Sequence, residues 1–295
     1  MEETRMPTST EHVVTPDLLR GWPLPEAGDS KYGRGQVVVV GGARRSPGAA
    51  MLAAEAALRV GAGRLTVATA ASVAPQLAIA LPECGVAFLV ETEDGHIAGG
   101  DLGPAVPDLE SADCVLVGPG LDDADQAAAT VRSVIEAVGE DAVVVLDAFG
   151  LGVLPGLVDE VQALRGRLVL TPNRQEAGIL LGREPGSDES ADVLEIADRY
   201  GAAVTCYGVV ASAEGETWRV GTGSSGLATS GSGDVLGGAV AGLAARGCGP
   251  AQAAVWATYA HAAAGDRLSV GVGPLGYLAR ELLPELPRAL VEVGG

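Results

Sequence analysis

One carboxylate, Asp234, lies within GTGSSGLATSGSGDVLGG, a stretch of mostly glycine and other small residues that begins at residue 221. Glycine permits positive φ and lets the backbone approach a ligand closely, and the first turn of a helix leaves N–H groups unpaired. Gly231, Ser232 and Gly233 are therefore predicted to form a phosphate-binding cradle at a helix N-terminus. Asp234 beside it is predicted to accept a proton from a substrate hydroxyl as that oxygen attacks a phosphate.

A simpler interpretation is that Ser232 and Asp234 only cap the helix, as these residue types commonly do. Capping alone would not call for Gly231, Gly233, Gly237 and Gly238 together, so we favour the phosphate site. It is not a Walker A loop, because that motif needs a lysine and Lys31 is the only lysine in the chain. The segment GGARRSPGAA at 41–50 also lacks the G-x-G-x-x-G dinucleotide fingerprint.

Composition limits the partners of this chain. It has 295 residues, of which 47% are hydrophobic, and a formal net charge of −19. A large core fits this composition, whereas nucleic acid and anionic membranes are disfavoured because both need clustered positive charge. The four cysteines form no C-x-x-C pair, and no apolar leader or membrane span is visible. We expect a cytoplasmic protein with reduced thiols.

The elements that must position Asp234 follow from the hydrophobic pattern. Short apolar runs at 36–42, 64–69, 114–120, 142–150 and 167–173 predict strands buried on both faces. Alanine-rich segments at 48–63 and 125–139 predict helices between them, and 202–221 predicts a further strand pair. This alternation indicates an α/β fold with a mostly parallel central sheet and helices on both faces. Several strands end in Gly, Pro, Asn or Asp, which predicts a ligand crevice along one rim.

Six motifs together resemble those of the ADP- or ATP-dependent NAD(P)H-hydrate dehydratases of the ribokinase-like superfamily. They are GGARRSPGAAMLAAEAALRVGAGRLTVAT, VLVGPGL, LDAFGL, TPNRQEAGILLG, GLATSGSGDVLGG and AHAAAGD. The resemblance covers roughly residues 33 to 290. The resemblance implies a ribokinase-like fold over residues 33–295, preceded by an N-terminal extension at 1–32 that is too short for the epimerase domain fused to many relatives.

The implied activity is that of a lyase. The nucleotide, ADP or ATP with Mg²⁺, phosphorylates the ring hydroxyl of hydrated NADH or NADPH (NADHX, NADPHX), and the phosphate then leaves to restore the cofactor. The resemblance also implies a homo-oligomer, a tetramer in many relatives.

Site residues can be assigned from the same motifs. The substrate would contact Ala49, Ala50, Gly120, Asn173 and Asp234. The nucleotide would contact Tyr207, Gly208, Val209, Val210, Ala211, Gly231, Ser232 and Gly233. Glu176 would orient the metal ion indirectly, through water.

Two of these positions depart from the family pattern. Asn173 stands where the family usually has histidine, and Tyr207 stands where it usually has lysine. Asn173 cannot titrate, and Tyr207 carries no charge at neutral pH. A cation needed there would come from Arg174, from the Arg44–Arg45 pair, or from Mg²⁺.

These departures keep two alternatives open. The N-x-x-E spacing of Asn173 and Glu176 is also typical of small-molecule kinases in the superfamily, so a kinase for a vitamin-like alcohol is the first. A catalytically silent nucleotide-binding protein is the second. His261 lies in an apolar helical pattern and is interpreted as a packed residue, while Asp147 and Asp266 could orient loops or do chemistry.

Overall fold

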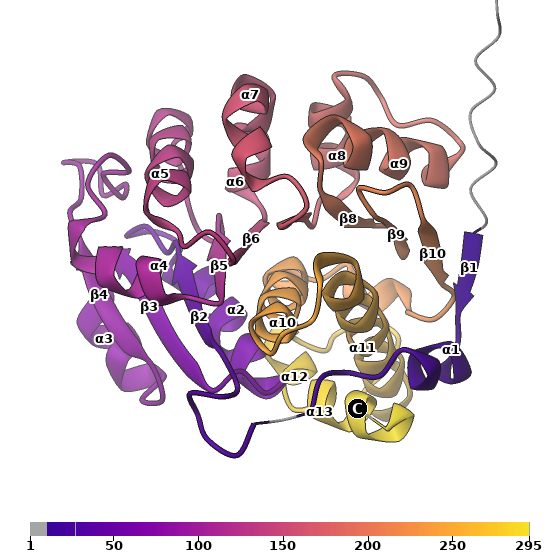
Figure 1. Ribbon diagram of the computed structural model, residues 1–295. Helices are drawn as coiled ribbons and strands as arrows, with labels where there is room; N and C mark the ends of the chain where they lie inside the picture. The colour runs from indigo at the N-terminus through magenta and orange to yellow at the C-terminus, as the bar shows by residue number, and fades with distance from the viewer. Residues whose placement is uncertain (1–10, 27, 295) are drawn as a thin grey trace, which may run out of the picture.

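A ten-stranded sheet forms the centre of the molecule (Figure 1). The structure, a computed structural model, describes residues 11–26 and 28–294. The strand order is β1-β10-β9-β8-β7-β6-β5-β2-β3-β4, and all neighbours are parallel except for β9, which is antiparallel to both β8 and β10. The predicted mostly parallel α/β fold is confirmed.

The strands are β1 (Glu11–Val14), β2 (Gln36–Val40), β3 (Arg64–Ala70), β4 (Gly85–Leu89), β5 (Cys114–Val117), β6 (Val143–Leu146), β7 (Leu168–Leu170), β8 (Ala203–Cys206), β9 (Val209–Ala211) and β10 (Thr217–Val220). In β2, Val37 and Val39 belong to the core on one side of the sheet, and Val38 and Val40 belong to the core on the other. Because successive side chains point to opposite faces, an unbroken valine run is buried on both.

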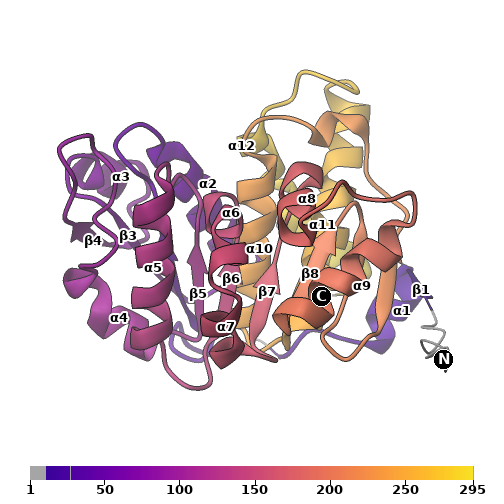
Figure 2. The same cartoon turned by 90° about the horizontal axis from the view of Figure 1, so that it is seen from above.

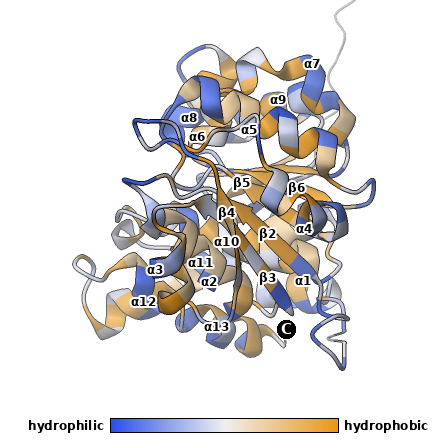
Figure 3. Cartoon of the chain, turned by 90° about the vertical axis from the view of Figure 1, so that its left-hand side faces the viewer, coloured by the Kyte–Doolittle hydropathy of each residue, from blue (hydrophilic) through white to orange (hydrophobic). Residues whose placement is uncertain are grey.

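Helices cover both faces (Figures 1 and 2). One layer contains α1 (Pro16–Gly21), α2 (Pro47–Arg59), α3 (Ala74–Ala80), α10 (Ser232–Ala245), α11 (Pro250–Gly271), α12 (Ala279–Leu282) and α13 (Glu285–Val293). The other contains α4 (Val106–Ser111), α5 (Ala124–Ala137), α6 (Phe149–Gly152), α7 (Val158–Val161), α8 (Arg174–Leu181) and α9 (Glu189–Tyr200). Figure 3 shows the strands largely in the hydrophobic colour between these layers. No helix in the described ranges combines the length and the apolar character that crossing a bilayer requires.

Two segments differ from the simplest sequence interpretation. Residues 202–221, expected as a strand pair, form the three strands β8, β9 and β10. Residues 11–14 add β1 to the edge of the sheet, parallel to β10. Behind it, the carbonyl oxygen of Trp22 accepts a hydrogen bond from Nε1 of Trp256 at 2.9 Å, which ties the start of the chain to α11.

Candidate functional site

The carboxyl ends of the central strands meet at one rim, as their polar endings predict. Gly42 N donates to Pro119 O and Ala43 N donates to Gly120 O, each at 2.9 Å, which joins the loop after β2 to the loop after β5. On the next strand along, Asp147 follows β6 and is buried. The predicted crevice therefore has its residues together at the strand ends.

Helix α10 begins at this rim. Its N-cap is Gly231, in the left-handed region at φ 88°, where glycine is favoured. Ser232 N donates to Thr229 O, which leaves the N–H groups of Gly233 and Asp234 in the open first turn. No described side chain caps this end, and a Cβ added to Gly233 would meet nothing within 4 Å. The capping interpretation is thus wrong, and the exposed backbone suits an anion.

Asp234 is the third residue of α10 and is partly exposed. Burial raises the pKa of its carboxyl to about 6. A carboxylate whose pKa lies near neutrality is well matched to general-base catalysis, because it is mostly ionised at pH 7 and still holds a proton well. The position and the titration of Asp234 both suit a base beside a phosphate.

Asp147 is a second carboxyl at the rim, and the sequence left its role open. It is 4% exposed, and its Oδ1 accepts a hydrogen bond from Oγ1 of Thr171 at 2.7 Å. Its Oδ2 is buried without a hydrogen-bond partner. The pKa of Asp147 is raised to about 8. Burial is the largest cause, and the negative charge of Asp234 is the second. The LDAFG motif does not indicate this raised pKa, because the pKa of Asp147 depends on which helix packs over the end of β6.

His261 supports the start of α10. It is 8% exposed, and its Nε2 lies 3.0 Å from both the hydroxyl and the carbonyl oxygen of Ser232. Burial lowers the pKa of His261 to about 4, so the ring is neutral and Nε2 donates to the carbonyl. His261 is packed, as expected, and it also holds the cradle in place.

The predicted substrate side lies where α2 starts. Ala50 is fully buried and Ala49 half-buried, while a Cβ on Gly120 would lie 2.3 Å from the carbonyl oxygen of Ser46. A Cβ on Gly231 would lie 2.6 Å from Cδ1 of Leu52 on α2. The start of α2, the loop after β5 and the start of α10 are therefore neighbours.

Two glycines counted toward the cradle have other roles. A Cβ on Gly238 would lie 2.0 Å from the carbonyl oxygen of Ala53, so this glycine lets α10 approach α2. A Cβ on Gly237 would lie 2.9 Å from Oδ2 of Asp147. Only Gly231 and Gly233 belong to the first turn and its N-cap, so the prediction that Gly237 and Gly238 also serve the phosphate site is wrong.

Asn173 and Glu176 form a capping box at the start of α8. Asn173 Oδ1 accepts from the N–H groups of Gln175 and Glu176 at 2.9 and 3.0 Å, and Glu176 Oε2 accepts from Asn173 N at 2.8 Å. Burial raises the pKa of Glu176. The N-x-x-E spacing is explained by this reciprocal cap.

Tyr207 and Gly208 make the two-residue turn between β8 and β9, with φ of 56° and 74°. Positive φ at both central residues is the geometry of a type I′ hairpin and is strained for tyrosine. The hydroxyl of Tyr207 is buried without a partner. The side chains of Val209, Val210 and Ala211 are fully buried, whereas the turn residues Tyr207 and Gly208 are partly exposed.

Arg174 supplies a positive charge at this turn. Its guanidinium lies 5.5 Å from the centroid of the Tyr207 ring, a cation–π distance. Arg44, by contrast, forms an ion pair with Glu91 at 3.1 Å. Arg174 is therefore the better placed of the cations that the sequence offered in place of a lysine.

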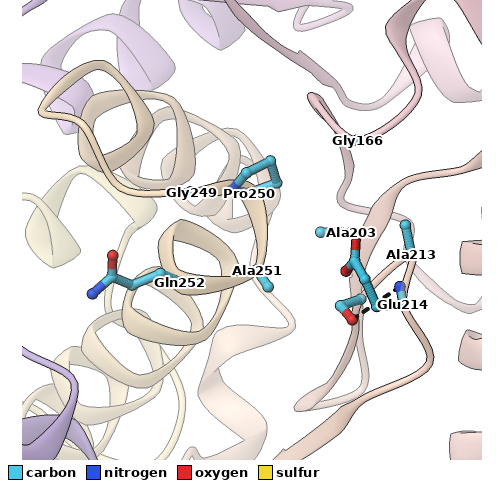
Figure 4. Close-up of a pocket in the computed structure, with 9 residues that line it drawn as sticks. Gly166, Ala203, Ala213, Glu214, Gly249, Pro250, Ala251 and Gln252 are labelled. Atoms are coloured by element: carbon cyan, nitrogen blue, oxygen red, sulfur yellow. Dashed lines mark hydrogen bonds between the residues drawn. The ribbon is translucent and has the colours of Figure 1, made fainter.

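A cavity of ≈ 260 Å³ lies between the turn and α11. It is lined by Pro172, Thr205, Cys206, Tyr207, Gly208, Val220, Thr222, Gly223, Leu227, Leu236, Thr258, His261 and Ala262. Asp266 orients its rim, since Oδ2 accepts from Gly223 N at 3.0 Å. A second cavity of ≈ 150 Å³, between Glu214 and Pro250, lies at the opposite ends of the strands (Figure 4). Predicted site residues line the first cavity and not the second.

Comparisons with known proteins support the family that the six sequence motifs indicated. The sequence model of the NAD(P)H-hydrate dehydratase family matches residues 37–288. The ADP-dependent (S)-NAD(P)H-hydrate dehydratase of Xanthomonas campestris is 42% identical over 285 residues, covering 94% of this chain and 96% of that protein.

Solved structures agree as well. The ADP/ATP-dependent NAD(P)H-hydrate dehydratase of Bacillus subtilis, co-crystallised with ATP/Mg²⁺, has a TM-score of 0.77 at 26% identity and covers 98% of this chain and 100% of that chain. A ribokinase-like superfamily protein of Enterococcus faecalis has a TM-score of 0.79 at 23% identity, with 96% of each chain covered, and supports the fold alone.

Proposed function

We propose, since this chain belongs to the NAD(P)H-hydrate dehydratase family, that it uses ADP or ATP to dehydrate NADHX and NADPHX and so restores NADH and NADPH. The enzyme is a lyase that breaks a carbon–oxygen bond, and its fold is ribokinase-like. Residues 33–295 carry the activity in this proposal, and 1–32 are an extension.

The reaction can be written with the groups at the rim. The ring hydroxyl of the hydrate attacks the terminal phosphorus of the nucleotide, and Asp234 accepts the hydroxyl proton. The bridging P–O bond breaks at the same time, and AMP leaves when the donor is ADP, or ADP when the donor is ATP. The N–H groups of Gly233 and Asp234 hold the phosphate oxygens as charge develops. Phosphate then leaves with the carbon–oxygen bonding electrons, and loss of a ring proton restores the dihydronicotinamide. Ala49, Ala50, Gly120 and Asn173 are proposed to contact the hydrate.

One observation carries this proposal: Asp234, with a pKa of about 6, stands in the open first turn of α10 next to unpaired backbone N–H groups. A base and an anion site side by side are what transfer of a phosphoryl group to a hydroxyl requires. The capping box gives the Asn173–Glu176 spacing a structural role, so this spacing by itself does not favour a kinase.

Mg²⁺ fits this site only together with the nucleotide. Among residues 11–26 and 28–294, no group of three or more His, Cys, Asp or Glu side chains could hold a metal ion. Mg²⁺ is usually bound through one or two carboxylates plus substrate phosphates and water, so Glu176 acting through water suffices in this proposal. The ion would neutralise charge on the transferring phosphate.

The position of the nucleotide and the oligomeric state are proposed from the likeness to relatives, and the compartment and partners from the composition of the chain. The nucleotide would enter at the Tyr207–Gly208 turn and β9, and reach Gly231, Ser232 and Gly233 with its phosphates. We propose a homo-oligomer, a tetramer, which sedimentation analysis would test. Free thiols at all four cysteines favour a reducing compartment such as the cytoplasm, and the charge of −19 disfavours nucleic-acid and membrane partners.

The test is to mix the protein with hydrated NADH, ADP or ATP, and Mg²⁺, and to follow the near-ultraviolet absorbance of reduced nicotinamide. Recovery of absorbance with release of phosphate is expected. A phosphorylated vitamin-like alcohol would instead identify a kinase, and nucleotide binding without turnover would identify a silent homologue.

A further inference from the structure

The carboxyl of Asp147 is enclosed at the strand ends. Thr171, the residue after β7, donates to Oδ1 at 2.7 Å, while Oδ2 faces Gly237 of α10, where an added Cβ would lie only 2.9 Å away. The main chain is held too, since a Cβ on Gly118 would lie 1.8 Å from the carbonyl oxygen of Asp147. With 4% exposure, Asp147 is almost entirely shielded from solvent.

Charges around Asp147 are negative. Asp234 of α10 and Glu176 of α8 both disfavour its ionised form, and burial acts in the same direction. His261 of α11, which is hydrogen-bonded to Ser232 at the start of α10, stays neutral because burial lowers its pKa to about 4. Hydrogen bonds from Thr171 and from the backbone of Ala148 act in the opposite direction, and they do not prevent the pKa of Asp147 from rising to about 8.

We propose that Asp147 is a positioning residue that stays a neutral acid during the reaction, so that Asp234 is the ionised carboxylate that meets the nucleotide phosphates. When Asp147 loses its proton, a second buried negative charge appears behind the first turn of α10. That charge opposes the field of the helix N-terminus and repels the phosphates. Asp147 thereby sets the alkaline limit of nucleotide binding. This inference rests on the proposed function only in taking the anion to be a nucleotide phosphate.

The proposal is tested with ADP at constant Mg²⁺, by calorimetric titration at pH values from well below to well above 8. Wild-type affinity is expected to fall by about tenfold or more across this range, since a buried like charge nearby is weakly screened. Asp147→Asn keeps the shape and the neutral charge but cannot ionise, so its affinity should stay nearly constant. An equal fall in both proteins would overturn the proposal, as would the absence of ADP binding at every pH.

Asp192→Asn is the matched control. Asp192 is a buried aspartate on α9, 5% exposed and paired with Arg183, away from the rim. This variant should keep the wild-type pH dependence of ADP affinity. A control that behaved like Asp147→Asn would show that loss of any buried carboxylate flattens the profile, which would also overturn the proposal.

A second measurement covers failure of Asp147→Asn to fold. Infrared difference spectra of the wild-type protein should show a protonated-carboxyl band at neutral pH that disappears as the pH passes about 8. Absence of that band would overturn the proposal. Dehydration of the hydrate is assayed separately: if it fails while ADP affinity shows the expected pH pattern, the proposed function falls and the role of Asp147 stands. If dehydration proceeds while ADP affinity lacks the expected pH pattern, the role of Asp147 falls and the proposed function stands.

Discussion

Asp234 and Asp147 have the same side chain but differ in protonation at neutral pH. Asp234 is partly exposed with a pKa of about 6, whereas Asp147 is 4% exposed and lies near Asp234, with a pKa of about 8. Burial acts on both, and the second negative charge separates them further. One carboxylate is thereby left as a base and the other as an acid.

Asp234→Asn should lower kcat by about 10²-fold or more, because an amide cannot accept the hydroxyl proton. ADP affinity should change by no more than a few-fold, since the backbone cradle remains. In the wild type, kcat/KM should fall as the pH drops below about 6, where Asp234 becomes protonated. Steady-state kinetics over a pH series and calorimetry measure these effects. Asp125→Asn, at an exposed position of α5, serves as the control, and unchanged turnover in Asp234→Asn would remove Asp234 from the mechanism.

Arg174→Ala should weaken ADP binding by about 1–2 kcal/mol and reduce its salt dependence, because Arg174 brings positive charge to the Tyr207 turn. Tyr207→Lys should tighten binding and restore affinity in the Arg174→Ala background. Titrations at low and high salt measure both. Arg132→Ala, which removes an exposed ion pair with Glu160, is the control. No change in either variant would mean that this turn does not face the nucleotide.

At the scale of elements, the contact between α2 and α10 determines where the cradle lies. Backbone atoms of the two helices approach so closely that side chains are excluded at Gly238 and Gly242. The Cβ positions would lie 2.0 Å from Ala53 O and 2.5 Å from Ala57 O. Small residues at this crossing therefore place the first turn of α10 beside the start of α2.

Gly238→Ala should lower the free energy of unfolding by about 1–3 kcal/mol, since the new methyl group must displace backbone. Gly152→Ala is the matched control, because its Cβ would meet nothing within 4 Å and alanine favours a helix. It should raise stability by up to about 1 kcal/mol. Urea denaturation of both variants measures the difference, and equal stabilities would argue against the close crossing.

At the scale of the whole molecule, buried acids link stability to pH. Unfolded, the Asp147 carboxyl would ionise near 3.8, but in the native protein it does so near 8. Between these values the native state binds more protons than the unfolded state, so stability falls as the pH rises. The contribution is fully present below about pH 4 and is lost by about pH 8.

Wild-type protein should therefore lose up to about 1.4 kcal/mol of stability per pH unit, relative to Asp147→Asn, as the pH rises between 5 and 7. Denaturation midpoints and slopes at several pH values, taken on both proteins in parallel, provide the comparison. Parallel curves would mean that Asp147 is ionised in the native state. The same result would contradict its proposed place in nucleotide binding.

The buried strands, the open start of α10 and the family could all be predicted from local sequence pattern. Valine runs such as 36–42 specify strands buried on both faces, because unbroken apolar segments need cover on each side. Glycines before Asp234 specify an open helix start, and the motifs identified the family. These properties are local in sequence, so they can be predicted without knowing which elements are neighbours.

Other properties depended on the packing of segments distant in the chain. Gly237 and Gly238 could not be distinguished from cradle glycines until Asp147 and Ala53 were seen against them. Asp147 Oδ2 lacks a hydrogen-bond partner because of the segments that pack around it. The stacking of Arg174 on Tyr207 likewise brings together residues that are distant in the chain. Burial and the neighbouring charges determine a pKa, and both are set by tertiary contacts, so the sequence specified which carboxyls are present while the fold decided which of them holds a proton.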